Sequence, residues 1–178
     1  MGIAILDYGS GNLRSAQRAF DKTGVPVEIT ADFDTALNAD GLVVPGVGAF
    51  SACMSGLSKI KGDEIVRMRR QLSRPTLGIC VGMQIFFSEG VEHGKHSGVG
   101  IWNATVEKLA SPIVADQSFY FVHSYAVKGE LPVLASKSFY GEEFISAVED
   151  ESFSATQFHP EKSGDAGLAL IRNWVTSL

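Results

Sequence analysis

Cysteine is scarce in this sequence, because only Cys53 and Cys80 occur among 178 residues. Two cysteines cannot build the disulfide framework of a small secreted domain, so we expect a reducing, cytoplasmic setting and a fold held by a hydrophobic core. Cys53 lies in an amphipathic segment and is interpreted as a small buried hydrophobe. With 45% hydrophobic residues, a chain of this length suits one domain over residues 1–178.

Positive charge and long apolar runs are also lacking. Lys and Arg total 15 against 20 Asp and Glu, so the net charge is −5. Nucleic-acid surfaces need clustered basic residues, and this balance argues against such a partner. The basic run of Arg67, Arg69, Arg70 and Arg74 is interpreted as a solvated helix face. No apolar stretch is long enough to span a bilayer, and the first residues do not read as a signal peptide.

Apolar runs alternate with amphipathic segments through the first 80 residues. This alternation predicts an α/β fold: a mostly parallel central sheet with helices on both faces. The predicted strands cover residues 3–7, 25–30, 41–45 and 75–79, and the helices 13–24, 32–40, 51–60 and 63–72. After about Val99 the pattern becomes rich in antiparallel strands, predicted at 99–109, 118–127, 132–140, 143–150 and 153–159, before a closing helix at 164–178.

A cysteine between two glycines follows the fourth predicted strand, in the segment Gly78-Ile79-Cys80-Val81-Gly82. This is the layout of a nucleophile elbow with cysteine in place of serine. The turn would expose the sulfur at the start of a helix, where free N–H groups favour the thiolate, and would aim the Val81 N–H at an oxyanion. The alternative is a buried cysteine flanked by glycines that serve helix–strand packing.

A cysteine nucleophile needs a base, and four histidines are available. His93 and His96 lie in a Gly-rich polar loop without supporting ligands, so no metal site is expected there. His123 lies among aromatic residues and is interpreted as a sheet histidine. His159 ends a strand-like run, and Glu161 would point the same way in extended chain, although a surface ion pair is the alternative. Two strand ends on one sheet would allow a Cys–His–Glu triad.

The segments "LGICVGMQ" and "FHPEKS" resemble the two signatures of class I (triad) glutamine amidotransferases, which have a flavodoxin-like, three-layer fold. "DYGSGNLRS", "VVPGVGAF", "FYFVHSYAV" and "ATQFHPEKSGDAGLALIRNW" narrow the resemblance to the glutaminase subunits of imidazole glycerol phosphate synthase, an enzyme of histidine biosynthesis. The resemblance extends over nearly the whole chain.

The resemblance implies a role for each matching residue. Cys80 would be the nucleophile, His159 the base and acid, and Glu161 the residue that orients His159. Oxyanion donors would come from Val81 and from the Pro45–Gly48 strand, at Gly46 and Val47. Glutamine would be bound by Gly48, Gln84, Ser124 and Tyr125. No cofactor is implied.

The resemblance also implies a partner. In the family, ammonia passes to a (β/α)₈-barrel cyclase subunit that makes imidazole glycerol phosphate and AICAR, and Asn12 lies in a motif near the docking face. The chain departs from the family over residues 110–117, where only "ASPIVADQ" replaces a longer segment that contacts the partner. Docking is therefore left open, as are two alternatives: a paralogue that supplies another ammonia acceptor, and a non-catalytic relative.

Overall fold

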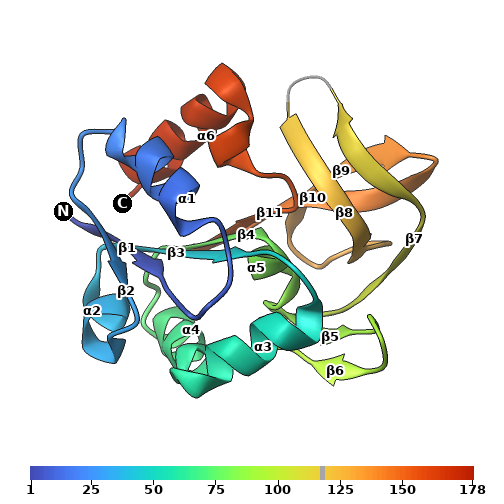
Figure 1. Ribbon diagram of the computed structural model, residues 1–178, viewed down its shortest axis with the longest axis horizontal. Helices are drawn as coiled ribbons and strands as arrows, with labels where there is room; N and C mark the ends of the chain where they lie inside the picture. The colour runs from blue at the N-terminus through green and yellow to red at the C-terminus, as the bar shows by residue number, and fades with distance from the viewer. Residues whose placement is uncertain (117–118) are drawn as a thin grey trace.

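Seven strands form the central sheet of the computed structural model, which describes residues 1–116 and 119–178 (Figure 1). The strand order is β2-β1-β3-β4-β11-β10-β9. The first five are parallel: β2 (Val27–Thr30), β1 (Ile3–Leu6), β3 (Gly41–Gly46), β4 (Thr76–Cys80) and β11 (Phe153–Thr156). At the far edge, β10 (Glu142–Asp150) and β9 (Leu134–Tyr140) run antiparallel. The predicted mixture of parallel and antiparallel strands is confirmed.

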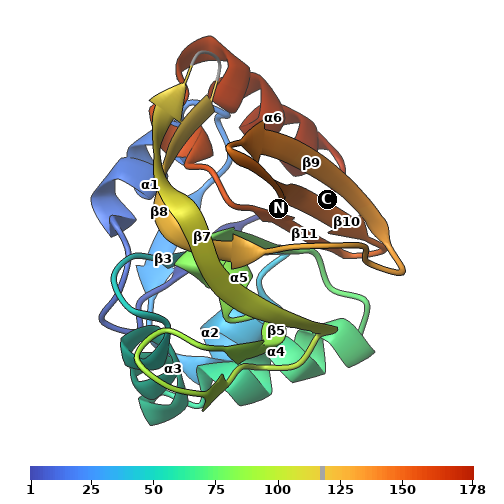
Figure 2. The same cartoon turned by 90° about the vertical axis from the view of Figure 1, so that its right-hand side faces the viewer.

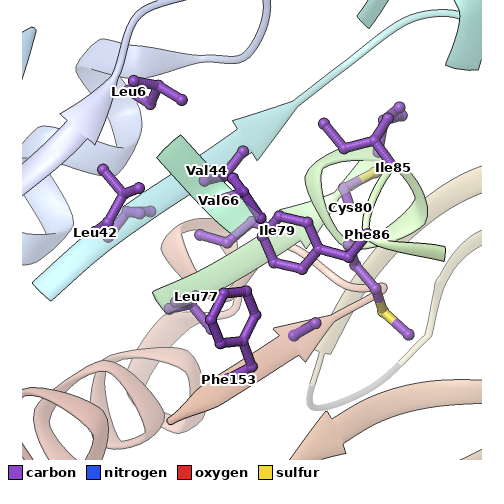
Figure 3. Close-up of a cluster of buried hydrophobic side chains, with 14 of the residues drawn as sticks. Leu6, Leu42, Val44, Val66, Leu77, Ile79, Cys80, Ile85, Phe86 and Phe153 are labelled. Carbon is purple, nitrogen blue, oxygen red and sulfur yellow. The ribbon is translucent and has the colours of Figure 1, made fainter. Parts of the chain in front are cut away.

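Helices cover both faces of this sheet, as predicted (Figure 1). One face carries α1 (Leu13–Asp21) and α6 (Gly164–Thr176), and the other carries α2 (Phe33–Asn38), α3 (Phe50–Lys59) and α4 (Gly62–Gln71). Asn12 caps α1, because its side-chain oxygen accepts the Ser15 N–H. The strands between the layers are buried on both sides, and Figure 3 shows part of the resulting apolar cluster, with Leu42, Leu77 and Phe153.

A second sheet, which the sequence did not predict, lies beside the first (Figure 2). Its order is β6 (His96–Ser97), β5 (Phe87–Gly90), β7 (Trp102–Asp116) and β8 (Phe119–Val127). The strands predicted at 99–109 and 118–127 belong here. The two short strands were missed because they have neither the length nor the alternation of a recognisable strand. Residues 110–116 of the shortened segment lie in β7, whereas residue 117 lies outside the described residues.

The interpretation of Arg69 as part of a solvated face is wrong. Its side chain is fully buried, with 0% exposure. The guanidinium donates to the main-chain carbonyls of Ala36, Leu37 and Ala39 at 2.8–3.0 Å, and to Pro75 at 2.6 Å. The C-terminal end of helix α2 leaves the carbonyls of Ala36, Leu37 and Ala39 without helical partners, so the buried arginine caps this helix from another element. Burial, with the nearby charge of Arg74, lowers the pKa of Arg69 to about 10.

Candidate active site

The turn at Cys80 has the strained geometry that a nucleophile elbow requires. Cys80 is the last residue of β4 and directly precedes α5 (Val81–Gln84), with φ 57° and ψ −114°, a conformation that residues with a side chain rarely adopt. A Cβ at Gly82 would lie 1.9 Å from the Val44 carbonyl oxygen, and one at Gly78 would lie 2.7 Å from the Phe86 ring. Both flanking glycines are therefore needed for the turn to pack against its neighbours.

The helix after Cys80 is short. It spans four residues, so its dipole can contribute only little to stabilising a thiolate. Figure 3 shows the Cys80 side chain beside Ile85 and Phe86, next to the apolar cluster. Although the side chain is only 3% exposed, it lines an open cavity, and both Cys80 and Cys53 are free thiols.

This cavity has a volume of about 240 Å³, which suits a ligand of the size of a single amino acid. It gathers residues from β4, α5, β8 and the loop after β3. The lining residues are Val47, Gly48, Cys80, Val81, Gln84, Glu92, Val122, His123, Ser124, Tyr125 and His159. Eight of the residues predicted from sequence are among them. Gly46, Glu161 and Asn12 are not: Gly46 is paired with Cys80 across β3 and β4, Glu161 lies behind His159, and Asn12 caps α1.

His159 and Glu161 are in direct contact. The imidazole Nδ1 lies 2.8 Å from Glu161 Oε1, and both side chains are 4% exposed. The predicted reason for this contact was wrong, because Glu161 does not continue an extended strand. Strand β11 ends at Thr156, and Glu161 belongs to a short 3₁₀ helix, η1 (Pro160–Lys162), which folds the carboxylate back onto the ring. The pair is buried, which excludes the surface ion pair.

The environment of His159 shifts its pKa. Burial lowers the pKa, but the side chain of Cys80 and then the hydrogen bond to Glu161 raise it, with a net result of about 9. Cys80 and His159 line the same cavity, although the described residues include no Cys80–His159 hydrogen bond of ordinary geometry. Such contacts are often long in the absence of substrate and shorten when it binds.

The Pro45–Gly48 segment starts at the end of β3, beside Cys80, and continues into the cavity wall, but its Val47 N–H is already engaged. It donates to Ser10 Oγ at 3.1 Å, and Ser10 Oγ in turn donates to the Val47 carbonyl at 2.8 Å. The thiol of Cys53 also donates to that carbonyl, at 3.3 Å. For Val47 to stabilise an oxyanion, its peptide unit has to rotate away from Ser10.

Three cavity residues were not predicted as site residues. Glu92, which follows β5, accepts the Phe50 N–H at 2.9 Å and brings a carboxylate to the wall. Val122 and His123 come from β8 with the predicted Ser124 and Tyr125. No local signal marks Glu92, because the fold of the β5–β6 hairpin alone brings it there. His123 had been interpreted as a sheet histidine, and it lies in a strand, but its ring also borders the cavity.

Two structural findings concern other kinds of site. Within residues 1–116 and 119–178, no cluster of three or more His, Cys, Asp or Glu side chains has the arrangement of a metal site. In the same ranges, none of the helices combines the length and the apolar character that crossing a membrane requires.

The sequence matches the family model "Glutamine amidotransferase class-I" over residues 4–178. It is 50% identical over 201 aligned positions to the imidazole glycerol phosphate synthase subunit HisH of Mycobacterium bovis, covering 99% of this chain and 98% of that protein. The corresponding HisH protein of Corynebacterium diphtheriae is 46% identical over 207 positions, covering 99% of both chains. Since this chain has 178 residues, at least 23 of the 201 positions fall opposite gaps in it.

Solved structures of low sequence identity share the fold. A putative GMP synthase protein from Thermoplasma acidophilum has a TM-score of 0.72 at 20% identity, covering 99% of this chain and 92% of that one. The PurLQS structure from Thermotoga maritima has a TM-score of 0.74 at 14% identity, covering 99% and 97%. The chain therefore belongs to the class-I glutamine amidotransferases and, among them, to the HisH subunits of imidazole glycerol phosphate synthase.

Proposed function

We propose that this protein hydrolyses L-glutamine to glutamate and ammonia through a Cys80–His159–Glu161 triad. We further propose that it passes the ammonia to a (β/α)₈-barrel cyclase subunit, which makes imidazole glycerol phosphate and AICAR. The observation that carries the proposal is the placement of Cys80 and His159 on one cavity, with Glu161 2.8 Å behind the imidazole. A nucleophile, a base and an orienting carboxylate are the parts that covalent amide hydrolysis needs.

The His159 pKa of about 9 suits the first step. At neutral pH it keeps the proton on the imidazole, and a positive charge beside a cysteine sulfur favours the thiolate, which is the attacking form. The thiolate adds to the side-chain amide carbon of glutamine, and the C=O electron pair moves to oxygen. Imidazolium then protonates the amide nitrogen as the C–N bond breaks, which releases ammonia and leaves a glutamyl thioester.

The second step returns the enzyme to its starting state. His159, now neutral, takes a proton from water, and the resulting hydroxide attacks the thioester carbonyl. Collapse of this intermediate releases glutamate and the Cys80 thiolate. Glu161 holds the imidazole orientation in both steps. No atom or electron is needed beyond glutamine and water.

Oxyanion stabilisation would come from the N–H of Val81 and from a rotated peptide unit in the Gly46–Val47 segment. In the structure the Val47 N–H is held by Ser10. Under this proposal, that conformation would be a resting state with one oxyanion donor withdrawn. Loss of one such donor typically slows catalysis by about 10²–10³. A subunit in this conformation would therefore be slow until a partner or ligand releases the strand.

Glutamine would lie in the cavity with its amide at Cys80. The Glu92 carboxylate suits the α-ammonium group, because an opposite charge in a partly buried wall is the strongest available partner. Gly48, Gln84, Ser124 and Tyr125 surround the remainder of the molecule. Asn12, which caps α1, would lie near the cyclase subunit.

A second candidate is an amidotransferase that serves another ammonia acceptor. This candidate is considered because at least 23 aligned positions of the Mycobacterium bovis protein fall opposite gaps in this chain. The shortened segment supplies none of the proposed triad residues, whereas its family counterpart contacts the partner. Both candidates use the same triad, so they differ only in what stimulates turnover.

Glutamate release, measured with and without a barrel cyclase and its nucleotide ligand, tests the proposal. Marked stimulation by that pair, abolished in Cys80→Ala, is the expected result. Turnover indifferent to the pair would support the other acceptor. Absence of turnover under all conditions would overturn the enzymatic proposal. A glutamine-like diazo ketone, diazo-oxo-norleucine, should label Cys80, and equal labelling of Cys53 would contradict the assignment.

A further inference from the structure

The sulfur of Cys80 has a second polar neighbour that the triad does not use. Gln157 follows β11 directly and is 1% exposed. Its side-chain Nε2 lies 3.9 Å from Cys80 Sγ, a long N–H···S contact. The main chain of Gln157 is held in place, because its N–H donates to the Ser146 carbonyl at 2.9 Å. A buried amide is thus fixed beside the reacting atom.

The orientation of this amide follows from its neighbours. Gln84 Nε2 lies 2.8 Å from the Tyr125 main-chain carbonyl and 3.1 Å from Gln157 Oε1. A main-chain carbonyl only accepts hydrogen bonds, so the Gln84 amide must present its nitrogen to Tyr125. The second N–H of that nitrogen then points to Gln157 Oε1. Because the oxygen of Gln157 is occupied in this way, its NH₂ group faces the sulfur.

We propose that Gln157 is a catalytic residue that donates a hydrogen bond to the Cys80 thiolate, and that Gln84 is a positioning residue that sets the direction of this donor. The proposal rests on the proposed function in taking Cys80 as the nucleophile. A donor aimed at the charged form of a group stabilises that form. The imidazolium of His159 places a positive charge next to the sulfur. Gln157 provides an uncharged hydrogen-bond donor, which remains after the imidazolium has given its proton to the leaving ammonia.

This arrangement gives Gln84 two tasks. It lines the glutamine cavity, and its nitrogen connects the main chain of β8 at Tyr125 to the amide of Gln157. Removing the Gln84 amide would leave Gln157 free to rotate and present either its nitrogen or its oxygen to the sulfur. The effect on Cys80 should therefore be in the same direction as loss of Gln157 itself, but smaller.

The test measures the rate at which iodoacetamide alkylates Cys80 across a range of pH, with peptide mass spectrometry to separate Cys80 from Cys53. The variants are Gln157→Leu, which removes the donor at similar size, and Gln84→Leu. Thr156→Val is the matched control, because Thr156 is a neighbouring buried polar residue (3% exposed) whose hydroxyl donates to the Phe158 carbonyl. Urea unfolding establishes that each variant is folded.

We expect alkylation of Cys80 in Gln157→Leu to be about tenfold slower at neutral pH and to approach the wild-type rate at high pH, as loss of a hydrogen bond to a charged group predicts. Gln84→Leu should show a smaller slowing, and Thr156→Val none. In turnover assays, Gln157→Leu should lower kcat about tenfold with little change in KM. If Gln157→Leu does not fold, the Gln84→Leu profile decides the matter.

Unchanged alkylation in the folded Gln157 and Gln84 variants would overturn the inference, and so would equal slowing in Thr156→Val, because the effect would then be structural. The alkylation experiment uses no glutamine and no partner. Its outcome is therefore separate from that of the proposed function: a shifted profile in a protein without glutaminase activity would support the hydrogen bond and reject the reaction.

Discussion

His123 should make the stability of this protein sensitive to mild acid. Its ring packs against Phe121 and Phe144, with ring centroids 5.8 and 5.4 Å away. Nδ1 lies 3.0 Å from the Tyr125 carbonyl and so must donate to it, while Nε2 is buried and has no hydrogen-bond partner among the described residues. Burial lowers the pKa of His123 to about 4, assisted by the charge of His159 and opposed by the Tyr125 carbonyl.

The sign of the effect follows from the direction of the shift. The pKa in the folded protein is lower than in the unfolded chain, about 6.5, so the unfolded chain binds the proton more tightly. The contribution to stability is present above about pH 6.5 and is lost as the pH falls towards about 4. At 1.36 kcal/mol per pH unit the full loss is about 3 kcal/mol, of which about 2 kcal/mol is reached by about pH 5.

Urea unfolding of the wild type and of His123→Gln, each at neutral pH and at about pH 5, measures this loss. Glutamine has a similar size but does not titrate, so the other acid-sensitive groups contribute nearly equally to both proteins and cancel in the comparison. The free energy of unfolding of the wild type should fall by about 2 kcal/mol more than that of the variant. An equal fall in both would refute the reasoning, because His123 would then titrate as it does in the unfolded chain.

Three further predictions concern the site and the core. Cys80→Ala should lower the pKa of His159 from about 9, since Cys80 is the largest cause that raises it, and NMR titration of the ring measures the change. Gly82→Ala should abolish either the reactivity of Cys80 or folding, because the added Cβ would lie 1.9 Å from the Val44 carbonyl oxygen. Diazo ketone labelling measures the reactivity of Cys80, and circular dichroism measures folding. Arg69→Met should destabilise the protein by about 3–5 kcal/mol in urea unfolding, since it leaves several buried carbonyls unpaired.

Matched control variants separate these effects from the loss of stability that any substitution in the same region could cause. Gly2→Ala places its Cβ where nothing lies within 4 Å and should leave folding unchanged. Arg67→Met removes a half-exposed arginine from the same helix as Arg69, with an ion pair to Asp63 at 2.8 Å, and should cost less than about 1 kcal/mol. A His159 pKa that stays at about 9 in Cys80→Ala, or an Arg69 variant as stable as the Arg67 variant, would contradict the corresponding prediction.

Local sequence patterns were sufficient for the α/β class and for most of the strands and helices. Parallel strands buried on both faces appear as continuous apolar runs, and helices carry caps such as Asn12. The short strands β5 and β6 carried no such pattern. Strand β6 pairs with β5, and β5 pairs with β7, so the strand conformation of both depends on neighbours across the sheet more than on their own residues.

Local sequence patterns also failed to predict which polar side chains are buried or lie at the site. Arg69 belongs to a helix with a charged pattern, yet the carbonyls that it pairs with come from α2 and from the loop before β4. Glu92 likewise has no distinguishing neighbours in sequence, and Gln157 lies in a segment that resembles the family but received no role. Glu92 and Gln157 contact residues more than forty positions away, and these contacts give them their significance.

The amino-acid sequence by itself determined the elbow, because two glycines around Cys80 allow a backbone conformation that larger residues exclude, and it determined most of the strands and helices through apolar periodicity. Tertiary structure alone decided which side chains meet. Thr156 and Ile79 pair in register across β11 and β4, and this brings Gln157 and His159 to Cys80 at the same edge of the sheet. The physical reason is that strand pairing and burial act between residues far apart in the chain, whereas backbone strain and periodicity act between neighbours.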